Sequence, residues 1–159
     1  LSTVTAALHE AGCRVSGGES VVALQSSGHL HSISAVRTAP YPGFPTDAQA
    51  ILMAALLKSR GATVFVETVF ESRYRHVDEL RRMGADISVA DRVAVVTGVP
   101  ALFGAPVRST DLRGGAALLV AGLMAEGETR IGDVHHIQRG YEDPVRDLRA
   151  LGADIHWKH

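Results

Sequence analysis

The sequence predicts an α/β fold with its helices inside and its sheets outside. Two predicted helices, 47–60 and 111–126, are apolar on every face through residues 50–57 and 116–125. A helix without a polar face is buried on all sides. Stretches rich in Val, Ile and Thr, a composition typical of strands, lie before and after both helices. Strands outside buried helices reverse the common arrangement, in which helices cover the faces of a sheet.

A long internal repeat supports this interpretation. Predicted helices end at Gly12, Gly84 and Gly152, so similar helix ends recur at intervals of roughly seventy residues. Glycine ends a helix because it adopts positive φ without a steric penalty, and we expect a strand to begin after each of the three. Intervals of this length indicate repeated blocks of several helices and strands rather than a short-repeat solenoid.

A second signal divides the chain into units. Thr46-Asp47 opens the first apolar helix, and Thr110-Asp111 opens the second. The same dipeptide at the same place in two blocks indicates that the blocks are related. We therefore predict a single domain that contains the tail of one unit and two further units, at residues 1–34, 35–98 and 99–159.

Each unit also contains an amphipathic helix and several strands. These helices lie near residues 76–83 and 142–151, where apolar residues recur at every third position between charged ones. Pro144 suits the first turn of its helix, with Asp143 as a candidate cap. Gly114-Gly115, inside the second apolar helix, is expected to let another element pack closely. Strands are predicted at residues 20–25, 30–36, 62–69, 86–97, 106–109, 129–134 and 153–157.

Composition indicates a globular protein and excludes several classes of function. The chain has 159 residues, of which 46% are hydrophobic and 21% are charged, enough for one core of ordinary size. With a net charge of −1 and no basic run, nonspecific binding of nucleic acid has no electrostatic support. The longest apolar run, 114–125, is shorter than the roughly 20 residues that a membrane-spanning helix needs. We expect neither nucleic acid nor a membrane as a partner.

Two further features concern the compartment and the extent of the chain. The single cysteine, Cys13, excludes an internal disulfide and suits a reducing compartment, so we expect a cytoplasmic protein. Cys13 matches Ala85 and Ala153 of the other units, which indicates a small core residue. The chain starts at Leu1 in what reads as a helix already under way, so we expect it to be a piece of a larger protein.

The segment from Pro40 to Pro45 is the most informative stretch of the chain. Three prolines and a glycine make it stiff, because each proline fixes its own φ and restricts the residue before it. The loop delivers the Asp47 carboxylate to the start of the first apolar helix. Thr46 or Asp47 suits an ordinary helix cap, but a loop this long uses more sequence than a cap requires. Rigid placement of one carboxylate also preorganises a reactive site.

Four segments combine an acid or arginine with a distinctive context: Pro-Gly-Phe-Pro-Thr-Asp at 42–47, Glu-Thr-Val-Phe-Glu-Ser-Arg at 67–73, Ser-Thr-Asp-Leu-Arg at 109–113 and His-Ile-Gln-Arg-Gly-Tyr-Glu at 136–142. In order and spacing they resemble segments of the UDP-N-acetylglucosamine enolpyruvyl transferases, within the enolpyruvyl transferase family. Ser72 and Gln138 stand where that family usually has asparagine and aspartate. The resemblance implies an inside-out α/β barrel domain of repeated βαβαββ units, in the C-terminal part of a two-domain enzyme.

The resemblance also implies an activity. Such an enzyme transfers enolpyruvyl from phosphoenolpyruvate to the 3′-hydroxyl of UDP-N-acetylglucosamine and releases phosphate, in the first committed step of peptidoglycan biosynthesis. The implied partners are these two small molecules and the N-terminal domain, and no cofactor is implied. The alternative enzyme is the shikimate-pathway member of the family, 3-phosphoshikimate 1-carboxyvinyltransferase. The alternative from another class is a non-catalytic module that binds a sugar nucleotide or packs against a partner.

The implied reaction needs a carboxylate and several cations. Asp47 is the candidate catalytic residue and substrate ligand, because a carboxylate near a hydroxyl can orient it and move its proton. Arg73, Arg113 and Arg139 are candidates for binding phosphate and carboxylate groups, which the planar guanidinium matches bidentately. We expect these four side chains to line one concave face, with the cations favouring ionised Asp47. Asp111 either caps its helix and orients Arg113 or binds substrate.

The remaining candidates are weaker. By resemblance, Val69 contacts the UDP-sugar through its backbone, although the sequence alone indicates that Val69 and Phe70 are core residues. Adjacent His135 and His136 would point to opposite faces of a strand, so we predict no metal site. The family's lysine–asparagine pair and cysteine loop have no match in this chain. We therefore expect the isolated chain to be inactive.

Overall fold

The computed structural model describes residues 1–18 and 20–158. Residues 19 and 159, which fall in the first and last predicted units, lie outside the described residues. The fold is α/β, as the sequence predicts. In chain order its elements are α1 (Ser2–Glu10), β1 (Arg14–Gly17), β2 (Val22–Gln25), β3 (Ala35–Arg37), α2 (Thr46–Ala55), β4 (Ala62–Val66), α3 (Val77–Arg82), β5 (Asp86–Ala90), β6 (Val93–Thr97), β7 (Pro106–Arg108), α4 (Leu112–Met124), β8 (Arg130–Gly132), α5 (His135–Gln138) and α6 (Pro144–Ala150).

The strands form three separate sheets. Strands β1 and β2 make an antiparallel hairpin, and β7 pairs with β8 in parallel. The largest sheet has the strand order β3-β4-β6-β5, in which β3 runs parallel to β4 and the other pairs are antiparallel. Within the described residues these three sheets do not close into the barrel that the resemblance implies.

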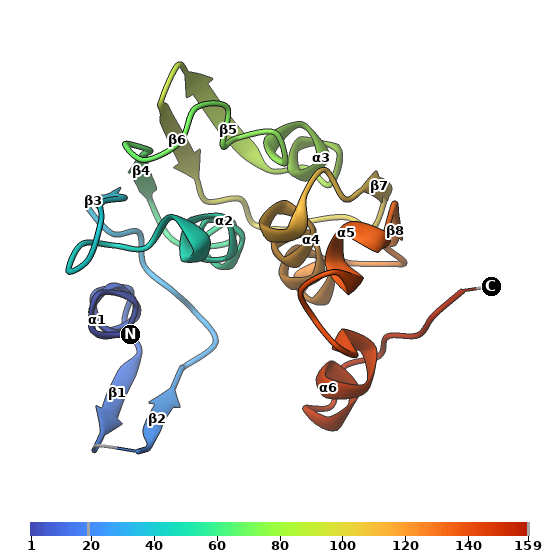
Figure 1. Ribbon diagram of the computed structural model, residues 1–159, viewed down its shortest axis with the longest axis horizontal. Coiled ribbons are helices and arrows are strands. Elements are labelled where there is room, and N and C mark those ends of the chain that lie inside the picture. The colour runs from blue at the N-terminus through green and yellow to red at the C-terminus, as the bar shows by residue number, and fades with distance from the viewer. Residues whose placement is uncertain (19, 159) are drawn as a thin grey trace.

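The two apolar helices pack against each other at the centre of the molecule. Figure 1 shows α2 and α4 side by side, with the β3–β6 sheet and α3 arching along one side. Met53 of α2 and Leu118 of α4 are fully buried. Burial on every face is confirmed for most of α2 but is wrong for α4, because Leu123 in its last turn is 46% exposed. The two helices thus contribute much of the core, which also includes strand residues such as Phe65 of β4 and Val96 of β6.

The helix ends follow the predicted repeat. Gly12, Gly84 and Gly152 have φ values of +99°, +93° and +94° and follow α1, α3 and α6. In this region a Cβ is strained, so glycine is the residue that suits these turns. Residues 35–98 contain β3, α2, β4, α3, β5 and β6, which is the order βαβαββ, whereas 99–158 contain β7, α4, β8, α5 and α6.

Several predicted boundaries are wrong. Helix α2 ends at Ala55. The Leu56 N–H is shared between the carbonyls of Leu52 and Met53, and the Leu57 N–H bonds to the carbonyl of Ala54, three residues back, so the last turn tightens. The predicted strand 86–97 is a hairpin that turns at Asp91, where φ is +52°. The predicted strand 153–157 is not formed by the described residues, which offer it no pairing strand.

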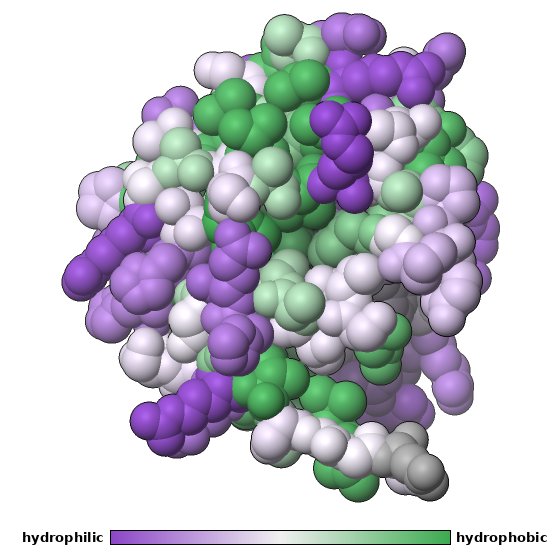
Figure 2. Space-filling model, turned by 90° about the vertical axis from the view of Figure 1, so that its left-hand side faces the viewer, coloured by the Kyte–Doolittle hydropathy of each residue, from purple (hydrophilic) through white to green (hydrophobic). Residues whose placement is uncertain are grey.

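The hairpin of β1 and β2 exposes apolar side chains. Val22 and Leu24 of β2 are 53% and 49% exposed. Figure 2 shows that apolar residues reach the surface between polar ones on one side of the molecule.

None of the described helices has the length and hydropathy needed to span a bilayer.

Candidate functional site

Asp47 lies in the first turn of α2 but does not cap it. The helix begins at Thr46, its N-cap is Pro45, and no side chain of the described residues caps it. The Asp47 carboxylate is 58% exposed and turns toward two arginines. Its Oδ1 accepts hydrogen bonds from Nε of Arg113 at 2.9 Å and from Nη2 of Arg73 at 3.3 Å. The interpretation of Thr46-Asp47 as a helix cap is therefore wrong.

Three separate segments bring these side chains together. Asp47 comes from the start of α2, Arg73 from the segment between β4 and α3, and Arg113 from the first turn of α4. The packing of α2 along α4 places the two helix starts close to each other. Three of the four side chains that the sequence predicts to line one face therefore meet, although they are far apart in the chain.

The arginines keep Asp47 ionised. The hydrogen bond from Arg113 has the largest effect, and the charges of Arg113 and Arg73 act in the same direction. Partial burial opposes them, yet the pKa of the Asp47 carboxyl lies below its usual value. The same hydrogen bond raises the pKa of the Arg113 guanidinium. The predicted effect of the cations on Asp47 is thus confirmed for the two that contact it.

Asp111, the repeat counterpart of Asp47, caps α4. Its Oδ1 accepts from the N–H groups of Arg113 and Gly114, both at 2.9 Å, and the Thr110 hydroxyl donates to Oδ2 at 3.2 Å. Burial raises the pKa of the Asp111 carboxyl, but these hydrogen bonds outweigh it and leave the pKa below its usual value. The cap fixes the backbone of Arg113, as one of the two interpretations of Asp111 expects.

Val69 and Phe70 lie at the surface, so the interpretation of both as core residues is wrong. Val69 is 38% exposed and Phe70 is 50% exposed. The Arg73 guanidinium lies 4.8 Å from the centre of the Phe70 ring, which allows a cation–π interaction. The Val69 N–H donates to Oε1 of Glu67 at 2.8 Å, so the protein itself already uses this backbone group.

Arg139 is placed near the site without a contact to it. It lies at the C-terminal end of α5 and is exposed. The next residue, Gly140, packs against Leu112 so closely that a Cβ on Gly140 would lie 2.6 Å from Leu112 Cδ2. The end of α5 therefore sits against the start of α4, which carries Arg113. Among the ion pairs of the described residues none includes Arg139, so its role stays a prediction.

Sequence reasoning missed two buried polar residues beside the site. Glu67 follows β4, is 1% exposed, and accepts five hydrogen bonds. His76 precedes α3 and is also 1% exposed, and its Nε2 has no hydrogen-bond partner among the described residues. Burial lowers the pKa of His76 to about 4, although the nearby Asp111 charge opposes this shift. The signal that could have found Glu67 is a charge at the end of an otherwise apolar strand.

The two adjacent histidines lie on a helix and not on a strand. His135 and His136 lie on the short helix α5 with ring centres 4.1 Å apart, so their expected placement on a strand is wrong. Among the residues that the structure describes, no three His, Cys, Asp or Glu side chains are grouped as metal ligands.

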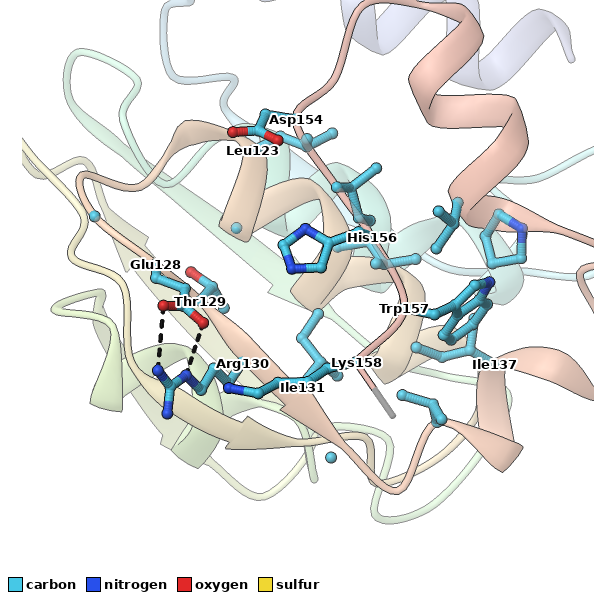
Figure 3. Close-up of a pocket in the computed structure, with 18 residues that line it drawn as sticks. Leu123, Glu128, Thr129, Arg130, Ile131, Ile137, Asp154, His156, Trp157 and Lys158 are labelled. Atoms are coloured by element: carbon cyan, nitrogen blue, oxygen red, sulfur yellow. Dashed lines mark hydrogen bonds and ion pairs between the residues drawn. The ribbon is translucent and has the colours of Figure 1, made fainter.

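A cavity of about 730 Å³ lies away from these residues, beside the C-terminal half of α4. Leu123, His156 and Trp157 are among its lining side chains, and the ion pair of Glu128 with Arg130 lies at its edge (Figure 3). None of the predicted site residues lines it. It lacks a carboxylate held between arginines, so we assign the candidate site to the surface around Asp47 instead.

Comparisons with known proteins agree with this fold. The profile of the EPSP synthase (3-phosphoshikimate 1-carboxyvinyltransferase) family matches residues 1–148, and the chain belongs to this family. The structure is similar to the enolpyruvyl transferase NikO from Streptomyces tendae, with a TM-score of 0.88 and 34% identity over 98% of this chain and 36% of that one. The α/β fold is therefore that of an enolpyruvyl transferase structure.

Two curated relatives carry a more particular name. The chain is 54% identical over 158 residues to a UDP-N-acetylglucosamine 1-carboxyvinyltransferase from Desulfofundulus thermocisternus, covering 99% of this chain and 64% of the relative. It is 50% identical over 151 residues to a protein of the same name from Magnetococcus marinus, covering 94% of this chain and 36% of the relative. The chain thus spans about two thirds of the first relative and about a third of the second.

Proposed function

We propose that this chain is the C-terminal part of a cytoplasmic UDP-N-acetylglucosamine 1-carboxyvinyltransferase. The complete enzyme transfers enolpyruvyl from phosphoenolpyruvate to the 3′-hydroxyl of UDP-N-acetylglucosamine and releases phosphate, in peptidoglycan biosynthesis. The observation that supports this proposal is the ionised Asp47 carboxylate between Arg73 and Arg113. It occurs in a chain whose relatives at 54% and 50% identity carry the name of this enzyme.

Asp47 is the residue that acts on the sugar hydroxyl. When the 3′-oxygen attacks C2 of phosphoenolpyruvate, a C–O bond forms, the hydroxyl proton leaves, and C3 gains a proton. The tetrahedral intermediate then loses the C3 proton and the phosphate group, which restores the double bond. A carboxylate orients the hydroxyl and accepts its proton. Because its arginine partners lower the pKa of Asp47, orientation of the hydroxyl is the larger part of its role.

The arginines bind the anionic groups of the substrates. Arg73 and Arg113 converge on Oδ1 of Asp47, so a phosphate or carboxylate placed beside that carboxylate would face both guanidiniums, which have further N–H groups to donate. Arg139 completes the cationic surface from the end of α5. Val69 contacts the UDP-sugar through its backbone, and Asp111 adds to substrate binding beside its role as a cap.

The proposal includes an architecture. Residues 35–98 have the element order βαβαββ, and 99–158 begin with the same βαβ order. We infer that units of this kind, with the tail at 1–34, form an inside-out barrel domain with helices inside. The reaction site then lies between this domain and the N-terminal domain, which is the proposed partner of this chain.

Phosphate release tests the proposed function. The complete polypeptide that contains this chain should release phosphate from phosphoenolpyruvate with UDP-N-acetylglucosamine and not with shikimate 3-phosphate. The isolated chain should release none, because the family's lysine and cysteine are missing from it. Preference for shikimate 3-phosphate would replace the proposed enzyme by the other family member, and full turnover by the isolated chain would refute the two-domain site.

Arg139→Ala should raise the KM for phosphoenolpyruvate steeply, since an anion partner is lost.

A further inference from the structure

Glu67 is a buried carboxylate for which the proposed reaction has no use. It directly follows β4 and is 1% exposed. A buried charge is costly unless it is paired or hydrogen-bonded. In the part of the chain that the structure describes, none of the ion pairs includes Glu67. Hydrogen bonds therefore stabilise this charge, and their donors show what Glu67 positions.

The first carboxylate oxygen holds the turn that follows β4. Oε1 of Glu67 accepts from the Thr38 hydroxyl at 2.9 Å and from the N–H groups of Val69 and Phe70 at 2.8 and 3.1 Å. Burial raises the pKa of the Glu67 carboxyl, but the backbone N–H groups and the hydroxyls outweigh it, so the pKa lies below its usual value. Glu67 is therefore ionised and can only accept hydrogen bonds.

The second oxygen controls Thr46, the first residue of α2. The Thr46 hydroxyl donates to Oε2 of Glu67 at 2.9 Å, and Nε2 of Gln49 donates to the same oxygen at 3.1 Å. Since the only proton of the Thr46 hydroxyl is committed to Glu67, its oxygen is left as an acceptor. Nε of Arg73 donates to that oxygen at 3.2 Å, and Nη2 of Arg73 reaches Asp47.

We propose that Glu67 is a positioning residue that aims Arg73 at the substrate anion by fixing the direction of the Thr46 hydroxyl. The inference rests on the proposed function, in which Arg73 binds an anionic group of phosphoenolpyruvate. The direction of the relay follows from its chemistry. A carboxylate only accepts, a hydroxyl has one proton, and a guanidinium only donates.

Glu67→Gln tests the relay with almost no change in volume. The oxygen of the new amide must face Val69 and Phe70, because their N–H groups only donate. Its NH₂ group then faces Thr46 and Gln49. Gln49 can turn its amide and accept from this group with Oε1, which has no partner among the described residues. The new NH₂ group donates to the Thr46 oxygen instead of accepting its proton, so the hydroxyl proton loses its acceptor and the amide competes with Nε of Arg73 for the lone pairs of that oxygen.

The expected kinetic result in the complete polypeptide is a rise in KM for phosphoenolpyruvate of about ten- to a hundredfold in Glu67→Gln, with a smaller change in kcat. Thr46→Val, which deletes the hydroxyl, should raise KM by a similar factor, and Thr46→Ser should restore it. Because both residues act in one relay, the double variant Glu67→Gln/Thr46→Val should be no worse than either single variant.

Glu79→Gln is the matched control. The Glu79 side chain is only 14% exposed, and its Oε2 accepts from the N–H of Arg108 at 2.9 Å. The control variant therefore loses a carboxylate that binds a backbone N–H, away from Arg73, and its KM should stay at the value of the parent. A KM that rises equally in Glu67→Gln and Glu79→Gln would indicate a general structural effect and overturn the proposal.

A second readout needs no turnover. Exchange of the Arg73 Nε–H with solvent, measured by NMR and assigned with Arg73→Lys, should be slow in the parent and in Thr46→Ser. It should be fast in Glu67→Gln and Thr46→Val. A parent that releases no phosphate would overturn the proposed function, whereas unchanged exchange in Glu67→Gln would overturn the relay. If Glu67→Gln does not fold, Thr46→Val and Thr46→Ser decide, and equal exchange in these two variants refutes the proposal.

Discussion

The two central helices open on the same dipeptide and use it differently. In α2, Thr46 and Asp47 are the first and second residues of the helix, and Pro45 is the N-cap. In α4, Thr110 and Asp111 precede the helix, and Asp111 is the N-cap. A shift of the helix start relative to the dipeptide therefore changes the carboxylate from a cap into a partner of arginines.

The segment before each helix explains the shift. Pro45, with φ −71° and ψ 130°, ends a proline-rich loop and brings no side-chain acceptor to the helix start. Asp111 follows strand β7 closely and is extended, with φ −166° and ψ 177°, so its side chain folds back onto the first N–H groups of α4. The preceding backbone, and not the Thr-Asp pair, therefore decides whether the carboxylate caps its helix or bonds to the arginines.

Among substitutions at the two helix starts, Asp47→Ala should have the largest effect on activity. In the complete polypeptide it should lower the rate of phosphate release roughly a hundredfold or more, because the group that orients and deprotonates the hydroxyl is lost. The melting temperature should hardly change, since Asp47 is 58% exposed and caps nothing in the described chain. A variant that melts earlier but keeps kcat within a few-fold of the parent would reverse the roles of Asp47 and Asp111.

His76, which packs against the first turn of α4, should make stability depend on pH. His76 is 1% exposed, and a Cβ on Gly114 of α4 would lie 2.9 Å from the His76 Cβ, so the side chain is packed closely against α4. Burial lowers the pKa of His76 to about 4. As pH falls below about 6.5, His76 becomes protonated in the unfolded chain, whereas in the folded chain it stays neutral until about pH 4. The free energy of unfolding should therefore fall by about 3 kcal/mol between pH 6.5 and pH 4.

Unfolding in urea at several pH values measures this dependence. His76→Gln should remove most of the slope between pH 6.5 and pH 4, whereas His29→Gln, at an exposed position, should leave it unchanged. The carboxyls of Glu67 and Asp111, whose pKa values are lowered, lose their contribution at lower pH, as they become protonated. An unchanged slope in His76→Gln would show that His76 is not the group responsible.

Gly115→Ala tests why α4 has a glycine at the position where α2 has Ile51. A Cβ on Gly115 would lie 2.5 Å from Cγ1 of Ile137 in α5 and would also meet the Ser109 hydroxyl. We expect a loss of about 1–3 kcal/mol in the free energy of unfolding. Gly122→Ala, whose Cβ would lie 3.4 Å from Thr129, is the control and should be neutral or stabilising by up to about 1 kcal/mol. Equal stability of both variants would show that α5 does not need this close approach.

The sequence predicted those parts of the fold that depend on local chemistry. The helix ends at Gly84 and Gly152 follow from positive φ, and the burial of α2 follows from its composition. The end of α2 could not be found in this way. Leu56 and Leu57 are buried in the turn after the helix, and an apolar pattern does not distinguish a buried turn from a further turn of helix. The predicted strand 153–157 failed because a strand requires a neighbour, which no local pattern reveals.

The same limit applies to the candidate site. Asp47, Arg73 and Arg113 could be named because their segments resemble a known family. The five hydrogen bonds of Glu67 could not be predicted, because several of their donors come from parts of the chain that only the fold brings together. His76 was missed for the same reason, since burial between α3 and α4 sets its pKa.

Asp111→Ala should have the smallest effect and decides between the two interpretations of Asp111. It removes the acceptor of the Arg113 and Gly114 N–H groups, so the free energy of unfolding should fall by about 1 kcal/mol, within a range of about 0.5–2 kcal/mol. Asp111→Asn keeps a good cap and should keep this stability. If Asp111 acts only through the backbone of Arg113, Asp111→Asn should also keep kcat and KM. A stable Asp111→Asn variant with a rate that falls as far as that of Asp47→Ala would show that the charge itself is needed, and both carboxylates would then belong to the site.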